Sequence, residues 1–207
     1  MFNIEFKGNY IAEKDLIQGQ KLPQNAVQFR EGETVQDAFM TGFFLMLPIM
    51  SVIIATSVQR CLQVQRHLTF SGRTIIAVVI VIVSIWLLTY IHEIIHGLLY
   101  PRGSQKTIWR YSKNGMFFVY CDAHVSKKRF IIINIVPSII LGIIPFIAWT
   151  MFMHYLSVEY IIGTMFIVWY MTFMSMGDYT NVYNSIRQVP KDAKIFNYGM
   201  HSYWIKE

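Results

Sequence analysis

The sequence has few charged residues, and this shortage excludes an ordinary soluble globular domain. Asp, Glu, Lys and Arg make up 14% of the 207 residues, against roughly 25% in a typical soluble domain. Hydrophobic residues make up 54%, and the remaining polar chain is too short to cover so much apolar surface in water. The composition therefore favours a protein that lies in a membrane.

Cysteine is also scarce, and further absences narrow the class of protein. The two cysteines, Cys61 and Cys121, are predicted below to lie on opposite sides of a bilayer, so no disulfide is expected. The first residues, MFNIEFKGNYIAEKDL, lack the apolar segment of a cleavable signal peptide. The net charge is +6, but the basic residues flank apolar runs and no nucleic-acid-binding motif accompanies them. A nucleic acid is therefore not an expected partner.

What the sequence does contain is four long apolar runs, each close to the roughly 20 residues of helix that cross a bilayer. Each is apolar around its whole circumference, as expected of a membrane helix. We therefore predict an all-α polytopic membrane protein with four transmembrane helices. The four runs are 38–58, 74–100, 130–153 and 160–177.

Lysine and arginine in the loops predict the orientation of these helices, because cytoplasmic loops carry an excess of both. Eleven of them lie in the loop 101–129 and in the tail 178–207, whereas the turn 154–159 has none. Three arginines in the loop after the first run favour the opposite orientation, but eleven positive residues against three still favour the first. We expect both termini in the cytoplasm, with an N-terminal arm (1–37), a membrane domain (38–177) that includes the loop 101–129, and a cytoplasmic tail (178–207).

The loop 101–129 contains a hairpin signal. Two β-prone runs flank Asn114 and Gly115, a dipeptide typical of a tight turn. At the N-terminus, Phe2, Ile4 and Phe6 alternate with polar residues, which is the period of a half-buried strand. We expect a small cytoplasmic β-hairpin or sheet, which the N-terminal strand either joins or contacts as a docked arm.

Three titratable residues interrupt the second apolar run near its end, in the stretch HEIIH from His92 to His96. Positions i and i+4 of a helix share one face, so both imidazoles can reach one metal ion. Glu93 lies one step around the helix, where it can act as a base on water. Each charged group costs about 2.5–3.5 kcal/mol in a membrane helix, so a compensating ligand is expected. The alternative is that the helix has left the membrane and these side chains lie at a wet interface.

A catalytic zinc ion normally has three protein ligands, so a third is needed. His92 lies 18 residues after Thr74, roughly 27 Å along a helix axis, which puts the motif near the cytoplasmic boundary. The fourth run crosses in the same direction and is followed by Asp178 at a similar depth. We predict Asp178 as the third ligand, with His124 as the alternative. The competing interpretation is that Gly177 and Asp178 only form the turn in which the chain leaves the helix, and bind no metal.

The third apolar run contains one polar candidate and two prolines. Asn134 lies about one turn inside this run, at the level of the motif, and an amide at that depth needs a partner. We predict that it binds the substrate or polarises the carbonyl under attack. A hydrogen bond to a neighbouring helix is the alternative. Pro137 and Pro145 are expected to kink this helix.

These features resemble a known group of enzymes. HEIIHG near the inner end of a membrane helix, a hairpin-bearing cytoplasmic loop and a later helix followed by an aspartate are similar to the intramembrane zinc proteases of the site-2 protease type. The four-helix size and the late Gly-Asp resemble more closely a small bacterial membrane family of zincin peptidases. The resemblance covers roughly 74–181. It implies that a sheet edge, here in the hairpin 108–121, holds the extended substrate by strand addition.

One departure from the site-2 protease type concerns the third ligand. There the aspartate usually stands in an Asn-Pro-Asp-Gly sequence, whereas Asp178 stands in MGDYTN.

The sequence thus predicts a zinc metallopeptidase of the HExxH type that cuts a membrane-spanning or juxtamembrane protein near the cytoplasmic face. Zinc would be held by His92, His96 and Asp178, and Glu93 would be the general base and then the proton donor to the leaving amine. The same ligands suit ferrous iron, but the glutamate-bearing helical motif favours zinc. The alternatives are a metal-binding scaffold or immunity-type membrane protein that cuts nothing, and a small ion-coupled transporter. The intact Glu93 favours the enzyme, because a structural zinc site does not need it.

Overall fold

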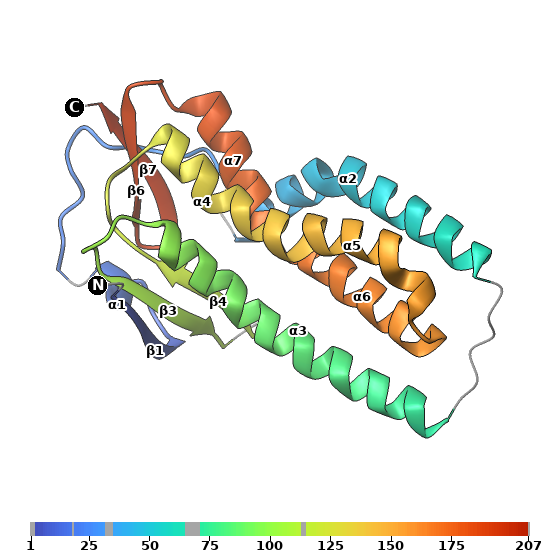
Figure 1. Cartoon of the computed structure of the whole chain (residues 1–207). Helices are drawn as coiled ribbons and strands as arrows, with labels where there is room; N and C mark the ends of the chain where they lie inside the picture. Colours follow the sequence, from blue (N-terminus) through green and yellow to red (C-terminus); the bar gives the residue numbers. More distant parts are fainter. Residues whose placement is uncertain (1–2, 18, 32–34, 65–70, 113–114, 207) are drawn as a thin grey trace.

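The structure is a computed structural model that describes residues 3–17, 19–31, 35–64, 71–112 and 115–206. Long helices run beside one another, and two small sheets lie with both chain ends at one end of the helices (Figure 1). Helices make up most of the described chain, as predicted.

Four helical stretches are long and apolar enough to cross a membrane, as predicted. Large apolar side chains on the outside of these helices are exposed, among them Ile76, Val83 and Trp86. Surface of this kind favours an apolar surrounding over water, and the four helices therefore point to a membrane protein. The four stretches are α2 (Val35–Gln63); α3 (Gly72–Leu99); α4 (Lys127–Ser138) with η1 (Ile139–Ile143), α5 (Ile144–Phe152) and η2 (Met153–Tyr155); and α6 (Val158–Met174) with α7 (Met176–Gln188).

The predicted hairpin and N-terminal strand are both present and form one sheet in the order β1-β3-β4. Strand β1 (Ile4–Tyr10) runs parallel to β3 (Lys106–Tyr111), which pairs antiparallel with β4 (Met116–Tyr120). The N-terminal strand therefore joins the sheet. Of the residues that carried these predictions, Phe2 and Asn114 lie outside the described part of the chain, and Gly115 adopts a positive φ of 72°, as a tight turn requires.

A second sheet, absent from the sequence-based prediction, is built largely by the C-terminal tail. Its strand order is β2-β7-β6-β5, and all its pairs are antiparallel. The tail thus folds back as a hairpin against strands that come from distant parts of the chain. The short helix α1 (Lys14–Ile17) follows β1 and precedes β2 in the sequence. The strands are β2 (Val27–Gln28), β5 (Val125–Ser126), β6 (Ala193–Tyr198) and β7 (His201–Lys206).

The third helical stretch changes its winding between its two prolines. Pro137 lies inside α4 and Pro145 in the first turn of α5, and the π-helical η1 lies between them. Proline has no backbone N–H to donate, and its ring clashes with the preceding turn of the helix. The wider π-helical turn makes room for this distortion. Gly142 in this stretch lets α6 approach, because an added Cβ would lie 2.7 Å from Thr172 Oγ1.

The fourth apolar stretch continues beyond its predicted end at residue 177. Helix α6 ends at Met174, and after the break at Ser175 the chain starts α7 at Met176. Asp178 therefore lies in the first turn of a new helix rather than in an exit turn. The positive end of the helix dipole favours a carboxylate at that position.

Gly42 allows α2 and α7 to touch through their backbones at the start of α7. A Cβ on residue 42 would overlap the carbonyl oxygen of Met176 and lie 2.8 Å from Thr180 Oγ1. The contact lies two residues before Asp178, so the position of the first turn of α7 depends on it.

We predict that Gly42→Ala lowers the melting temperature of the protein in detergent by about 2–10 °C, since overpacking of this kind costs roughly 1–3 kcal/mol. The matched control is Gly177→Ala in α7, where an added Cβ meets nothing within 4 Å. It should leave the melting temperature unchanged or raise it, because alanine favours helix. Equal melting temperatures of the two variants would contradict this account of the α2–α7 contact.

Candidate metal centre

The end of α3 directs two histidines to one point. His92 and His96 lie one turn apart, and their Nε2 atoms are 3.0 Å from each other. Both residues are buried, with 2% and 5% of their surface exposed. The Nδ1 of His96 lies 2.9 Å from the backbone oxygen of Ile133. Because a carbonyl only accepts, Nδ1 carries the hydrogen and Nε2 offers its lone pair to the site.

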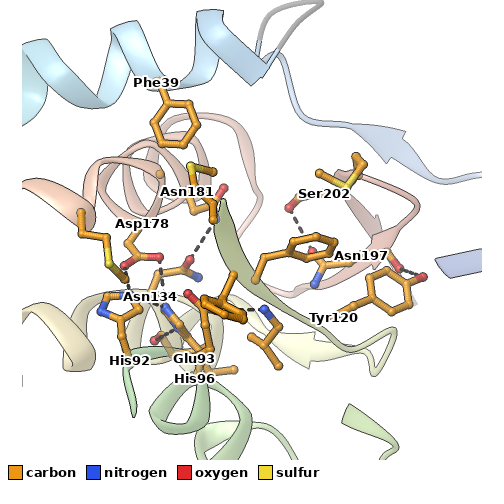
Figure 2. A pocket seen from close by; sticks show the side chains of 18 of the residues that line it. Phe39, His92, Glu93, His96, Tyr120, Asn134, Asp178, Asn181, Asn197 and Ser202 are labelled. Carbon is orange, nitrogen blue, oxygen red and sulfur yellow. Dashed lines mark hydrogen bonds and ion pairs between the residues drawn. The ribbon is translucent and has the colours of Figure 1, made fainter. Parts of the chain in front are cut away.

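Asp178 reaches the same point from α7. Its Oδ2 lies 3.1 Å from the Nε2 of His92, and its Oδ1 lies 3.3 Å from the Nε2 of His96. The three side chains point toward one another in Figure 2, and their donor atoms lie within 4.8 Å of one another. The structure therefore brings together the three residues predicted as metal ligands.

This donor set fits a zinc ion. Zinc binds nitrogen and oxygen at about 2.0–2.2 Å in a tetrahedron, so neighbouring ligand atoms stand about 3.3 Å apart. The two Nε2 atoms are 3.0 Å apart, and each lies 3.1–3.3 Å from a different oxygen of Asp178, which is close to that value. Two imidazoles and one carboxylate also leave a fourth position open, which is the pattern of a catalytic zinc site.

Glu93 lies on the same turn of α3 but faces the first sheet. The residue is 7% exposed, and its Oε2 accepts a hydrogen bond of 2.9 Å from the backbone N–H of Val119 in β4. Gly97 explains the close approach, because a Cβ there would lie 3.0 Å from Ile4 Cδ1 and 3.7 Å from Val119 Cγ2. The glycine that follows HEIIH therefore lets the sheet pack directly on the motif.

Asn134 is buried beside the histidines and links two helices. Its Nδ2 donates to the backbone oxygen of Phe130 at 2.8 Å, and its Oδ1 accepts from the Nδ2 of Asn181 at 2.9 Å. Asn181 was missed from the sequence, although it stands three residues after Asp178 and so shares its helix face. The hydrogen bond between helices, which was the alternative role for Asn134, is thus present.

A cavity of about 450 Å³ opens beside these residues. Helices α3, α4, α6 and α7 contribute to its wall, and so do strand β4 and the turn between β6 and β7 (Figure 2). The contribution of the β6–β7 turn was not predicted, because the tail reaches the site through the second sheet. Residues of the wall that the sequence did not point to include Tyr100, Tyr120, Asn197 and Ser202.

Asn197 connects the tail to the end of α3. Its Nδ2 donates to the hydroxyl of Tyr100 at 3.1 Å and to the backbone oxygen of Cys121 at the same distance. Burial raises the pKa of Tyr100 above its ordinary value, and burial raises the pKa of Tyr120 to about 12. Both phenols therefore stay protonated and uncharged at neutral pH.

The alternative ligand, His124, lies elsewhere. It is exposed, and its ring stacks on that of Phe196 with centroids 4.3 Å apart. Within the described chain, the cluster able to hold an ion comprises His92, His96 and Asp178.

Comparison with known proteins agrees with this geometry. A family model described as "Putative zincin peptidase" matches residues 85–194, which is 110 of the 207 residues. The matched segment contains His92, Glu93, His96 and Asp178. Comparisons with curated proteins and with solved structures found no match.

We predict about one zinc ion per chain in protein purified in detergent. His92→Ala and Asp178→Ala each remove a predicted ligand. They should therefore weaken zinc binding by more than the roughly 10- to 100-fold that is lost when a hydrogen-bond partner of a ligand is removed. Zinc content by mass spectrometry after dialysis measures this. His124→Ala is the matched control and should keep its zinc. Full zinc content in the Asp178 variant would exclude Asp178 as a ligand.

Proposed function

Because the chain belongs to the putative zincin peptidase family, we propose that it is a zinc metalloprotease of the membrane, and that it cuts membrane-spanning or juxtamembrane proteins near the cytoplasmic face. One observation carries the proposal: His92, His96 and Asp178 converge beside Glu93, at the end of an apolar helix that meets the sheets. A metal-binding triad with an adjacent carboxylate is what peptide hydrolysis by zinc requires.

Three residues hold the zinc ion in this proposal, namely His92, His96 and Asp178. When bound there, the ion supplies Lewis acidity, which polarises a peptide carbonyl and lowers the pKa of water toward about 7. The Ile133 carbonyl fixes the ring of His96 by its bond to Nδ1. The Asn134–Asn181 bond holds α4 against α7 and so supports the position of Asp178.

Glu93 takes the proton of the attacking water and passes it to the leaving amine, the two tasks of a general base and acid in peptide hydrolysis. Its burial in the cavity wall keeps bulk water from competing for the proton. Asn134 lies in the same wall, and its second amide hydrogen is directed at the substrate in this proposal.

The substrate binds as an extended strand. Strand β4 stands at the end of the order β1-β3-β4, and its residues form part of the cavity wall. The edge of a sheet presents backbone donors and acceptors to which an extended peptide can pair. A helical membrane segment must therefore unwind before it reaches the zinc site.

The two sheets and both termini lie in the cytoplasm, and the turn around residue 155 lies outside. The eleven lysines and arginines of 101–129 and 178–207 support this orientation. The zinc site is then close to the cytoplasmic surface, because it lies at the end of α3 that meets the sheets (Figure 1).

A labelling experiment tests this orientation. In a chain with Cys61→Ser and Cys121→Ala, single cysteines are introduced by Tyr155→Cys and Lys191→Cys, both at exposed positions. A membrane-impermeant maleimide added to intact cells should label the first variant and not the second. After cell lysis, both should react. Labelling of Lys191→Cys in intact cells would reverse the proposed orientation.

The activity itself is tested with fluorescently labelled casein, an unfolded polypeptide, and the zinc-loaded protein in detergent. Glu93→Gln should lower the rate of hydrolysis by at least 100-fold, since it removes the general base, while its zinc content stays that of the wild type. Removal of zinc by a chelator should abolish hydrolysis, and added zinc should restore it.

Two results would count against the protease. Full activity of Glu93→Gln would exclude Glu93 as the base. Zinc-loaded wild-type protein that binds casein without cutting it would favour the metal-binding scaffold instead. His124→Ala, at a residue outside both the metal-binding cluster and the cavity wall, is the control for effects of substitution as such.

A further inference from the structure

The backbone N–H of Val119 is bonded to the proposed base Glu93 and lies on the strand where the substrate is proposed to pair. In the β3–β4 pair, Val119 stands opposite Ile108, and Phe117 stands opposite Arg110. Residues along an antiparallel strand direct their N–H groups alternately toward and away from the neighbouring strand. Because the N–H of Val119 is bonded to Glu93, it points away from β3. The N–H of Phe117, two residues earlier, points the same way.

These outward groups form the free edge of β4 that faces the cavity. A substrate strand that pairs with this edge places one of its carbonyls on the N–H of Val119. That N–H already donates to the Oε2 of Glu93 at 2.9 Å. Since one N–H makes one good hydrogen bond, the substrate carbonyl and the Glu93 carboxylate compete for it.

We propose that the backbone N–H of Val119 is a positioning group, which holds Glu93 while the cavity is empty and gives it up to a carbonyl of the incoming strand. The inference rests on the proposed function and extends it. Binding of an extended chain then frees the carboxylate that the reaction needs. A segment that stays helical cannot make this exchange, because its carbonyls are bonded within the helix.

The surroundings determine which of the two partners moves. Val119 packs against a core cluster that includes Tyr100, Cys121 and Ile133, and Gly97 holds α3 close to β4. The strand is therefore fixed, whereas the Glu93 side chain can rotate about its own bonds. The exchange requires a change of rotamer at Glu93 and no movement of the backbone.

Two substitutions of Glu93 separate this role from catalysis. Neither Glu93→Gln nor Glu93→Ala can act as the base, so casein binding is measurable without cleavage. Glutamine keeps an oxygen that can accept from Val119, whereas alanine leaves the N–H free. In the zinc-loaded protein, Glu93→Ala should bind fluorescein-labelled casein roughly 2- to 10-fold more tightly than Glu93→Gln, the range of one net hydrogen bond. Fluorescence anisotropy in detergent measures the two affinities.

Proline at the strand edge completes the experiment. Val119→Pro removes the contested N–H, and proline is tolerated on an edge strand where no ladder bond is lost. In that background the two Glu93 variants should bind casein equally. Phe117→Pro is the matched control: it removes the neighbouring outward N–H, so it should weaken binding of both variants and leave their ratio unchanged. Zinc content of one ion per chain shows that each variant is folded.

A ratio near one in the chain with Val119 intact overturns the inference, and so does a ratio that survives Val119→Pro. If Val119→Pro fails to fold, the comparison of the two Glu93 variants still decides. Absence of casein binding by Glu93→Ala also overturns it. Failure of the proposed function is a separate result. It would be seen as zinc-loaded wild-type protein that does not cut casein, whatever the ratio of the two affinities.

Discussion

The burial of two imidazoles and a carboxylate at the end of an apolar helix is the constraint on which the rest of the structure depends. Polar groups in such a place are unfavourable unless each has a partner. The partner of both His92 and His96 is Asp178 of α7, which lies far from them in the sequence. A divalent ion held among the three donors would give all of them a partner at once.

Several features of the bundle follow from the need to bring Asp178 to this point. The break at Ser175 starts a new helix, so that the carboxylate stands in a first turn, where the helix dipole favours it. Gly42 lets α2 press against that start. Asn181 then ties α7 to Asn134 of α4. Each contact is made by a small or polar residue inside the bundle, as is usual where membrane helices meet.

The sequence predicted what local patterns encode. Apolar runs marked the four helical stretches, the i and i+4 spacing marked His92 and His96, and helix depth marked Asp178. The β-prone runs around residues 114–115 marked the first sheet. Except for Asp178, which was found by comparing the depths of two distant helices, each signal lies within some twenty to thirty residues of chain, the range over which periodicity and helix length act.

The features that the sequence did not predict depend on contacts between distant segments. Helix α7 follows an apolar run with a gap of one residue, and no proline marks the break at Ser175. The hairpin of β6 and β7 is stabilised by short strands from residues 27–28 and 125–126. Asn197 reaches the cavity only through that sheet. The role of Val119 is not encoded by its side chain at all, since the group that acts is a backbone N–H.

The place of the sheet edge beside the zinc site has a physical reason under the proposed function. A peptide bond must leave the helix before a catalytic group can reach it, and an unwound backbone has unpaired donors and acceptors. In a bilayer these groups have no water to pair with, so unwinding there is costly. The free edge of β4 offers them partners at the end of α3 that meets the sheets. Because Glu93 accepts from that same edge, the backbone group that stabilises the unwound chain also determines when the base is free. Recognition of an extended substrate and readiness for catalysis therefore become one event.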